Sequence, residues 1–224
     1  SAEFGVGPAR AGLTVSAVVL AIAGAAALYG PLSDALGRRR VMAGAMALLS
    51  LATLPCAFAP SLGALVALRA LQGLFVPGMT AVSVAYAGDR FEAAALSGVV
   101  GGVIGASVVG GLLGRLGAGA VTAGLGWRAA FAAFAALTLL AAAALWRELS
   151  PARAAARAGL RAATRGMLGH LRSPRLLGAF LVGASLFFGW IGIFTYLPYH
   201  LTGRWGLSTG LVSSVYLVYA AGVL

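Results

Sequence analysis

The chain has 224 residues, of which 61% are hydrophobic and 9% are charged, and its formal net charge is +11. Because soluble domains carry about 25% charged residues, this composition excludes an ordinary soluble domain and indicates a polytopic membrane protein. A nucleic-acid-binding protein can share the positive charge, but it presents that charge as a solvated patch, whereas the arginines here flank apolar runs. The single cysteine, Cys56, excludes a disulfide framework and a thiolate metal site.

Seven apolar segments predict an all-α helix bundle, because each is near the roughly 20 residues that a helix needs to span a bilayer. They are residues 11–32, 41–58, 62–86, 94–114, 128–147, 176–197 and 208–224, and the last is cut short. If the connections alternate between the two sides, most arginines fall on one side, which the positive-inside rule places in the cytoplasm. We therefore expect an integral protein of a bacterial plasma (inner) membrane.

The connection between the first two segments combines an acid, a tight turn and three arginines. It reads Gly30-Pro31-Leu32-Ser33-Asp34-Ala35-Leu36-Gly37-Arg38-Arg39-Arg40. Two hydrophobic segments joined this tightly must be antiparallel neighbours. The pattern resembles the signature loop between transmembrane helices 2 and 3 of the major facilitator superfamily. The resemblance implies a transporter built from two six-helix halves, of which this chain is a fragment covering helices 2 to 8.

Asp34 is expected at the carboxyl end of its helix, where the helix macrodipole disfavours a negative charge, so it needs a partner. Arg38 is one candidate, and the amino terminus of a helix from the other half is another. The resemblance implies that Asp34 and Arg38, with Gly30, Gly37 and Arg39, form a cytoplasmic latch that is made in one access state and broken in the other. The alternative is a topological anchor without a switching role.

Arg69 lies inside the third apolar segment, about 10 Å from its outer boundary at about 1.5 Å per residue. An ionisable residue at that depth suggests a functional site. Gln72 and Gly73 share its helical face. Together the three residues resemble the helix-4 motif of proton-coupled facilitators, which implies a proton or substrate pathway. The alternative is an arginine that extends outward to the interface. Pro77 is expected to kink this helix.

Two further patterns remain open between function and packing. The segment 94–114 places small residues four positions apart, which lets helix backbones approach closely, at Gly102, Ala106 and Gly110, with Gly111 beside them. Family antiporters carry a Gly-Pro pair where Ala106-Ser107 stands here, so packing without a coupling role is equally expected. In the segment 176–197, Phe187, Trp190 and Phe194 fall near one face, which suits either an apolar substrate cavity or lipid.

The resemblance divides the chain into residues 1–147, an amino-terminal half without helix 1, residues 148–175, a cytoplasmic linker, and residues 176–224, which contain helices 7 and 8. Arginines recur every four residues from Arg153 to Arg165, which predicts a basic amphipathic helix on anionic lipid. Nucleic-acid binding by this stripe is not expected.

We therefore expect a secondary active transporter that works by alternating access and exports small amphipathic or drug-like molecules in exchange for protons. A sugar or metabolite carrier of the same superfamily and a non-transporting membrane scaffold are the alternatives. An enzyme is not expected, because the sequence offers neither a nucleophile beside a base nor clustered metal ligands. No cofactor is expected, the coupling carboxylate is expected in helices outside this chain, and the oligomeric state is left open.

Overall fold

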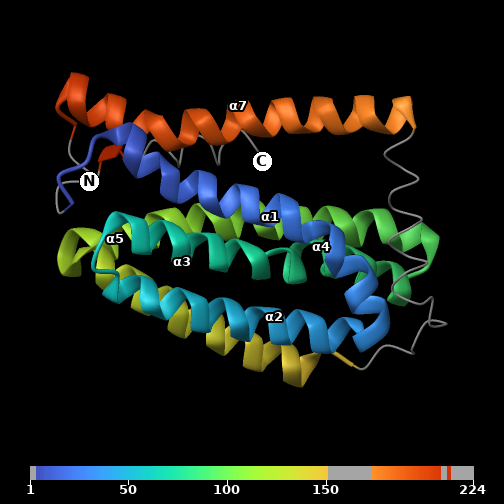
Figure 1. The fold of residues 1–224 in the computed structure, drawn as a ribbon. Coiled ribbons are helices and arrows are strands. Elements are labelled where there is room, and N and C mark those ends of the chain that lie inside the picture. The colour runs from blue at the N-terminus through green and yellow to red at the C-terminus, as the bar shows by residue number, and fades with distance from the viewer. Residues whose placement is uncertain (1–3, 151–172, 208–210, 213–224) are drawn as a thin grey trace.

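The computed structural model describes residues 4–150, 173–207 and 211–212, and every described element is a helix (Figure 1). The expected all-α fold is therefore confirmed for the described residues. The predicted amphipathic helix in the linker falls mostly on residues 151–172, outside the described residues, and so does most of the segment 208–224.

The first hairpin is formed by α1 (Pro8–Leu36) and α2 (Arg38–Thr53). Gly37 joins them alone, with φ 92° and ψ 135°, a backbone conformation that side-chain-bearing residues rarely adopt. Its amide donates to the carbonyl of Ser33 over 3.0 Å. One glycine thus makes the whole turn, and the two helices run back antiparallel, as the tight connection predicts (Figure 1).

The next span contains a break at the expected place. A short 3-10 helix, η1 (Leu54–Phe58), follows α2, and α3 (Leu62–Phe75) begins after Ser61, whose hydroxyl accepts from the amide of Ala64 over 3.2 Å. The fourth α-helix, α4 (Pro77–Arg90), starts directly at Pro77. Since proline has no amide hydrogen and clashes with the preceding turn, the span divides into α3 and α4 there.

The longest helix, α5 (Ala93–Glu148), has 56 residues. At about 1.5 Å per residue it measures about 84 Å, far more than the about 30 Å of a bilayer core. It reverses at Gly126, where φ 84° and ψ 164° interrupt the helix, and Figure 1 shows its two arms running antiparallel. The sequence predicts a connection over residues 115–127, but helix continues to the residue before Gly126. No proline interrupts this Ala/Gly/Leu-rich stretch, so nothing stops the helix earlier.

The last described helix, α7 (Pro174–Trp205), ends at Gly206, which adopts the left-handed conformation typical of a helix carboxyl cap. Its carboxyl-terminal part lies beside the amino-terminal part of α1, where Tyr196 faces Gly12 (Figure 1). Among the described residues, five stretches are long and apolar enough to cross a membrane: Pro8–Leu36, Arg38–Phe58, Leu62–Arg90, Ala93–Glu148 and Pro174–Trp205. With the two arms of α5 counted separately, these stretches correspond to six of the predicted segments. The predicted count of seven is not confirmed.

One cluster of buried side chains lies between α1, α2 and α4 and consists of Ala25, Tyr29, Val41, Met42, Ala45 and Val82. A second contains Cys56, Ala59 and Leu65. Gly78 lies directly against Ala45 and Tyr29, and a Cβ on it would sit 2.6 Å from the Tyr29 ring. Small residues at such contacts are what let membrane helices pack closely. Large apolar side chains point outward instead, with Leu20 72% and Phe188 82% exposed, a surface suited to lipid.

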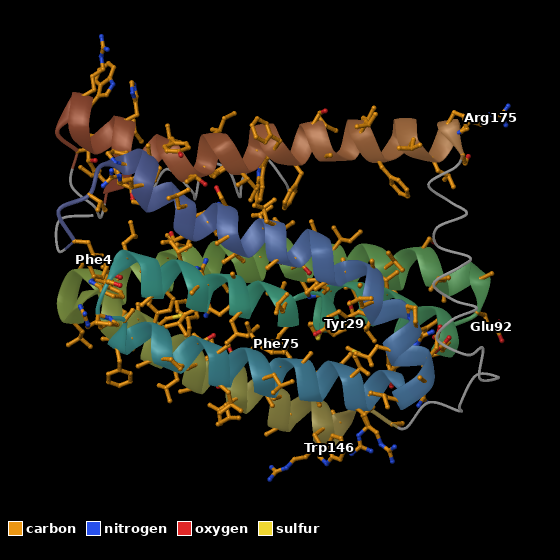
Figure 2. The ribbon with its side chains drawn as sticks, viewed as in Figure 1. Phe4, Tyr29, Phe75, Glu92, Trp146 and Arg175 are labelled. Carbon is orange, nitrogen blue, oxygen red and sulfur yellow. The ribbon has the colours of Figure 1, made fainter. Side chains whose placement is uncertain are left out.

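The connections gather at two ends of the bundle. Figure 2 shows Glu92 and Arg175 at one end and Phe4 at the other. The turn between α1 and α2 and the carboxyl end of α5 lie at the same end of the bundle as Glu92 (Figure 1). The alternation of connections assumed in the sequence analysis therefore matches the arrangement of the described helices.

Candidate functional site

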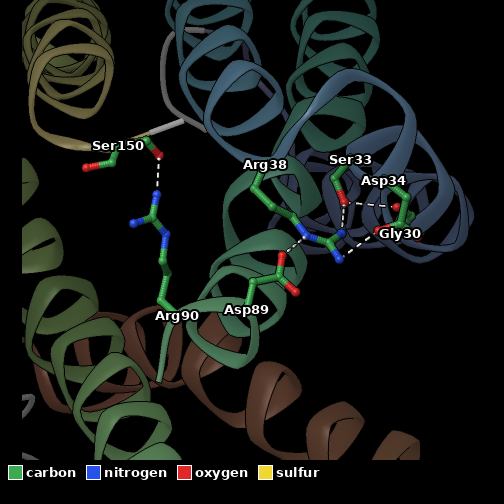
Figure 3. A network of polar contacts seen from close by, with 7 residues as sticks. All are labelled: Gly30, Ser33, Asp34, Arg38, Asp89, Arg90 and Ser150. Atoms are coloured by element: carbon green, nitrogen blue, oxygen red, sulfur yellow. Dashed lines mark hydrogen bonds and ion pairs between the residues drawn. The ribbon is translucent and has the colours of Figure 1, made fainter. Parts of the chain in front are cut away.

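Arg38, the first residue of α2, joins the ends of three helices (Figure 3). Its Nη2 lies 2.6 Å from Oδ1 of Asp34 on α1, and its Nε lies 3.0 Å from Oδ2 of Asp89 on α4. Its Nη1 also donates to the hydroxyl of Ser33. The Ser33 hydroxyl donates in turn to the carbonyl of Gly30 over 2.9 Å. We call the ion pairs of Asp34, Arg38 and Asp89 the arginine bridge.

Helix electrostatics explain why these three charges meet. Asp34 and Asp89 lie near the carboxyl ends of α1 and α4, and Arg38 lies at the amino end of α2, so each charge faces the helix end that disfavours it. Mutual pairing offsets this cost. The Arg38 side chain is 12% exposed, while each carboxylate is 34% exposed. The bridge is therefore open to water on its acidic side.

The sequence predicts the pair of Asp34 and Arg38 but misses Asp89. The only available signal was positional, because Asp89 follows the apolar segment 62–86 on the side where the loop 33–40 also lies. Gly37 makes the turn between α1 and α2. A Cβ on Gly30 would meet nothing within 4 Å among the described residues, so these residues show no close contact that requires a glycine there. The switching role of this group stays a prediction.

Two arginines adjacent to the bridge hold the carboxyl end of α5. Arg39 donates to the carbonyl of Trp146, and its guanidinium carbon lies 4.6 Å from the centre of the Trp146 ring. Arg90 donates from Nη2 to the carbonyl of Ser150 over 2.9 Å (Figure 3). The last carbonyls of a helix have no partner within it and carry partial negative charge, so arginine is a suitable cap for them. We call Arg39 and Arg90 the α5 clamp.

Arg69 and Gln72 meet as their spacing predicts. Nη1 of Arg69 donates to Oε1 of Gln72 over 2.9 Å, and Nε2 of Gln72 donates to the hydroxyl of Thr53 over 2.7 Å. The Thr53 hydroxyl donates to the carbonyl of Leu49 over 2.6 Å. The guanidinium of Arg69 also lies 5.9 Å from the ring of Phe131. A chain of hydrogen bonds thus links a half-buried cation on α3 to α2, and Thr53 is a member that the sequence did not reveal.

Gly73, predicted together with Arg69 and Gln72, faces α1. A Cβ there would meet the carbonyl oxygen of Val18 and would lie 2.7 Å from the Cβ of Ala21. Its position is therefore one of direct contact between α1 and α3 rather than an extension of the hydrogen-bonded chain.

A cavity of about 410 Å³ lies between α4, α5 and α7. Three hydroxyls and one cation line it beside apolar side chains: Thr80, Ser83, Ser107 and Arg115. Trp190 closes it from α7, and Gly111 contributes from α5. The apolar segment predicted from the sequence ends at residue 114, which leaves Arg115 in the connection that follows it. The structure instead places Arg115 within the first arm of α5, where it lines this cavity.

The aromatic residues of α7 stack along one face. The ring centres of Phe187 and Trp190 are 5.9 Å apart, and those of Trp190 and Phe194 are 5.2 Å apart. Trp190 lines the cavity, whereas Phe187 is 53% exposed. The guanidinium carbon of Arg115 lies 5.3 Å from the Trp190 ring centre and 5.0 Å from that of Phe194. Trp190 thus lines a cavity and Phe187 lies at the surface. A substrate-binding role for the three rings stays a prediction.

The small-residue stripe of α5 is exposed at Gly102, Ala106 and Gly110. A Cβ on Gly102 or Gly110 would meet nothing within 4 Å among the described residues, so close packing at this stripe stays a prediction. Within residues 4–150, 173–207 and 211–212, no group of three His, Cys, Asp or Glu side chains could hold a metal ion.

The family model of the Major Facilitator Superfamily matches residues 1–224. The chain belongs to this superfamily. The match extends the likeness of the loop 30–40 to the whole sequence. Major facilitators carry small molecules and are not enzymes, so the chain is assigned to a transporter family and, with its apolar helices, to integral membrane proteins.

Individual major facilitators show the same relationship. The chain is 30% identical over 224 residues to the uncharacterized MFS-type transporter YybF of Bacillus subtilis, covering 99% of the chain and 55% of that protein. It is 32% identical over 225 residues to the inner membrane transport protein YnfM of Escherichia coli, covering 99% and 54%. Over 91 residues, 41% of the chain and 21% of the relative, it is 36% identical to the niacin transporter NiaP of Acinetobacter baylyi. The chain spans about half the length of YybF and YnfM.

Proposed function

We propose that this chain is part of a secondary active transporter that works by alternating access in a bacterial plasma (inner) membrane and exports small amphipathic molecules in exchange for protons. Membership of the superfamily supports transport, and the name of YnfM supports the membrane. In this proposal residues 1–147 and 176–224 belong to the two halves, and residues 148–175 join them.

The arginine bridge is the observation that carries the proposal. Alternating access needs contacts that hold one state and still break within the transport cycle. An exposed ion pair contributes about 0.2–1 kcal/mol, so two pairs sharing Arg38 contribute about 2 kcal/mol at most and shift a two-state equilibrium by about thirtyfold at most. Since both carboxylates are one-third exposed, water can replace either contact at little cost. The ion pairs of the bridge are therefore weak enough to break and re-form during a transport cycle, as the proposed latch requires.

Arg69 is the proposed member of the proton or substrate pathway. It is a cation within a span, and its hydrogen bonds go to the neutral Gln72. All five acids of the sequence lie outside or at the ends of the apolar segments: Glu3, Asp34, Asp89, Glu92 and Glu148. A proton-carrying carboxylate within the membrane therefore has to come from outside this chain, and its absence from the full-length protein would count against proton exchange.

A metabolite carrier is the second candidate, supported by the similarity to NiaP over 91 residues. A non-transporting scaffold is the third. One assay separates them: substrate-induced collapse of a pH gradient in inverted membrane vesicles that contain the protein made from the full-length reading frame. We expect a cationic, neutral, anionic and sugar panel to contain at least one compound that collapses the gradient.

Arg69→Ala should abolish that collapse, because it removes the cation and leaves the amide oxygen of Gln72 without its donor. Arg69→Lys, at equal amounts of folded protein, should retain part of it, since the charge remains. Uptake of a compound without any pH change would indicate a uniporter. A folded protein that moves none of the panel would favour the scaffold.

A further inference from the structure

We propose that the surface shared by α2 and the second arm of α5, after Gly126, binds an anionic phospholipid whose headgroup phosphate is held by Arg40 and Arg147. The lipid belongs to the leaflet at the arginine-rich end of the bundle. This site is distinct from the arginine bridge, from the cavity beside α7 and from the lipid contact predicted for the linker. It gives the protein a partner other than its substrate and does not depend on the proposed transport function.

The first support is the way in which the two helices lie together. The Ser50 hydroxyl donates to the carbonyl of Ala135 over 2.6 Å, and Arg39 donates to the carbonyl of Trp146. Arg39 to Ser50 and Ala135 to Trp146 cover equal numbers of residues, so the helices run antiparallel in a constant register. At about 1.5 Å per residue the shared surface is about 16 Å long, about the depth of one leaflet of a bilayer core of about 30 Å.

The second support is a pair of arginines at one end of this surface. Arg40 and Arg147 each follow a member of the contact between Arg39 and Trp146 by one residue, and both are exposed. Neither has an ion pair among the described residues. Figure 2 shows side chains ending in nitrogen around Trp146 at the edge of the bundle. Because an arginine fork binds two phosphate oxygens at once, two such groups suit one phosphodiester.

The acids at this end do not cancel the charge. Both aspartates pair with Arg38. Glu148 is exposed and has no ion pair among the described residues. At these two helix ends, Arg39, Arg40 and Arg147 thus stand against one carboxylate. Basic side chains beside a membrane attract anionic lipids, so the balance favours a negatively charged headgroup.

The third support is the outward face of α2. Gly44, Leu48 and Leu51 follow Arg40 at helical spacing, so the four residues share one face. A Cβ on Gly44 would meet nothing within 4 Å among the described residues, and both leucines are exposed. A charged residue, a small residue and two leucines thus occur in the order of a phospholipid's headgroup, glycerol and acyl chain.

The second arm of α5 repeats this order. Inward from Arg147, Ala144, Leu140 and Leu137 fall on one face at helical spacing, and all are exposed. Both faces carry their arginine at the same end, since Arg39 meets Trp146 there. The Trp146 ring is 50% exposed at that level, and tryptophan is enriched at the membrane–water interface. The two faces together therefore fit a lipid with its headgroup at the arginines and its chains along the leucines.

Titration with two lipids that share their acyl chains tests the site in the purified full-length protein. We expect native mass spectrometry to show that the first palmitoyl-oleoyl phosphatidylglycerol binds about tenfold more tightly than the matching phosphatidylcholine, because two arginines attract its charge. Glycerophosphoglycerol, the same headgroup without chains, should not displace it at equal concentration. Equal affinities of the two lipids would overturn the inference, and so would displacement by glycerophosphoglycerol, which would indicate a site for small anions.

Variants then locate the preference. The double variant Arg40→Gln and Arg147→Gln should lower the preference for phosphatidylglycerol to about twofold or less, since both phosphate-binding groups are lost. The matched control is Arg10→Gln with Arg204→Gln, which removes the same charge from two exposed arginines at the opposite end of the bundle (Figure 1). It should bind both lipids as the parent does. A preference that survives in the first double variant, or that falls equally in the control, would overturn the site.

A second copy of the chain is the other occupant that such a surface could take, and the same spectra give the oligomeric state. Gly44→Phe fills the open position next to Arg40 on this face and should weaken phosphatidylglycerol severalfold. Gly24→Phe, at an equally open position of α1, should leave the affinity unchanged. A dimer that Gly44→Phe abolishes while the preference for phosphatidylglycerol stays unchanged would assign the surface to a second copy and overturn the lipid site.

Discussion

At Arg38, one side chain meets charges from two other helices because three helix ends converge there. Each of its carboxylate partners is 34% exposed, so solvent screens both pairs and each contributes about 0.2–1 kcal/mol. Asp34 is four positions away on the chain, whereas Asp89 lies on another span. The contact with Asp89 is therefore the one that reports on tertiary structure.

A double-mutant cycle measures that contact. Arg38→Gln and Asp89→Asn should each lower the free energy of unfolding by about 1 kcal/mol or less, and the double variant should lose about 0.5 kcal/mol less than the sum. Denaturant unfolding of the full-length protein, followed by tryptophan fluorescence, gives these values. Glu92→Gln, which has no ion pair among the described residues, should add independently to Arg38→Gln. Strict additivity with Asp89→Asn would contradict the bridge.

Among the helices, α5 depends most on one residue. Gly126 has φ 84° and ψ 164°, a region of backbone conformation that is essentially restricted to glycine. The arms before and after it would otherwise form one rod longer than the membrane is thick. The reversal of a 56-residue helix is thus set by a residue that the sequence does not distinguish from its neighbouring glycines.

Gly126→Ala should destabilise the protein by about 1–3 kcal/mol, the cost of holding an alanine in that conformation. Gly124→Ala is the matched control, since Gly124 is helical and a Cβ on it meets nothing within 4 Å among the described residues. It should be neutral or slightly stabilising, because alanine is the better helix former. Unfolding midpoints of the two variants provide the comparison. Similar losses of stability in the two variants would mean that the added methyl group, and not the backbone conformation of Gly126, causes the destabilisation.

For the whole molecule, the sequence predicted those features that depend on residues close together in the chain. The apolar segments, the turn at Gly37, the break at Pro77 and the meeting of Arg69 with Gln72 all follow from residues close in sequence. Asp89, Thr53 and the cavity involve contacts between spans, and no periodicity encodes which helix faces which. Arg115 was assigned to a connection for a similar reason, since the end of the first α5 arm has no stop signal before Gly126.

The sidedness of the molecule is testable with single cysteines. Ser61 and Ser150 are both exposed. Ser61 precedes the start of α3 and Ser150 follows the end of α5, and these two helix ends lie at opposite ends of the described bundle (Figure 1). Ser61→Cys should react with an impermeant maleimide in intact cells, and Ser150→Cys only in inverted vesicles, because the arginine-rich end is expected in the cytoplasm. Cys56 is 0% exposed, so the parent provides the unlabelled background. The reverse pattern would contradict the orientation.

The α5 clamp gives the bundle a mechanical property. Arg39 and Arg90 hold the end of α5, and each is joined by one peptide bond to a bridge residue, Arg38 or Asp89. A pull on the chain at Ser150 is therefore transmitted to the bridge over the length of a single residue. We therefore expect tension in the chain after α5 to change the lifetime of the ion pairs of the arginine bridge.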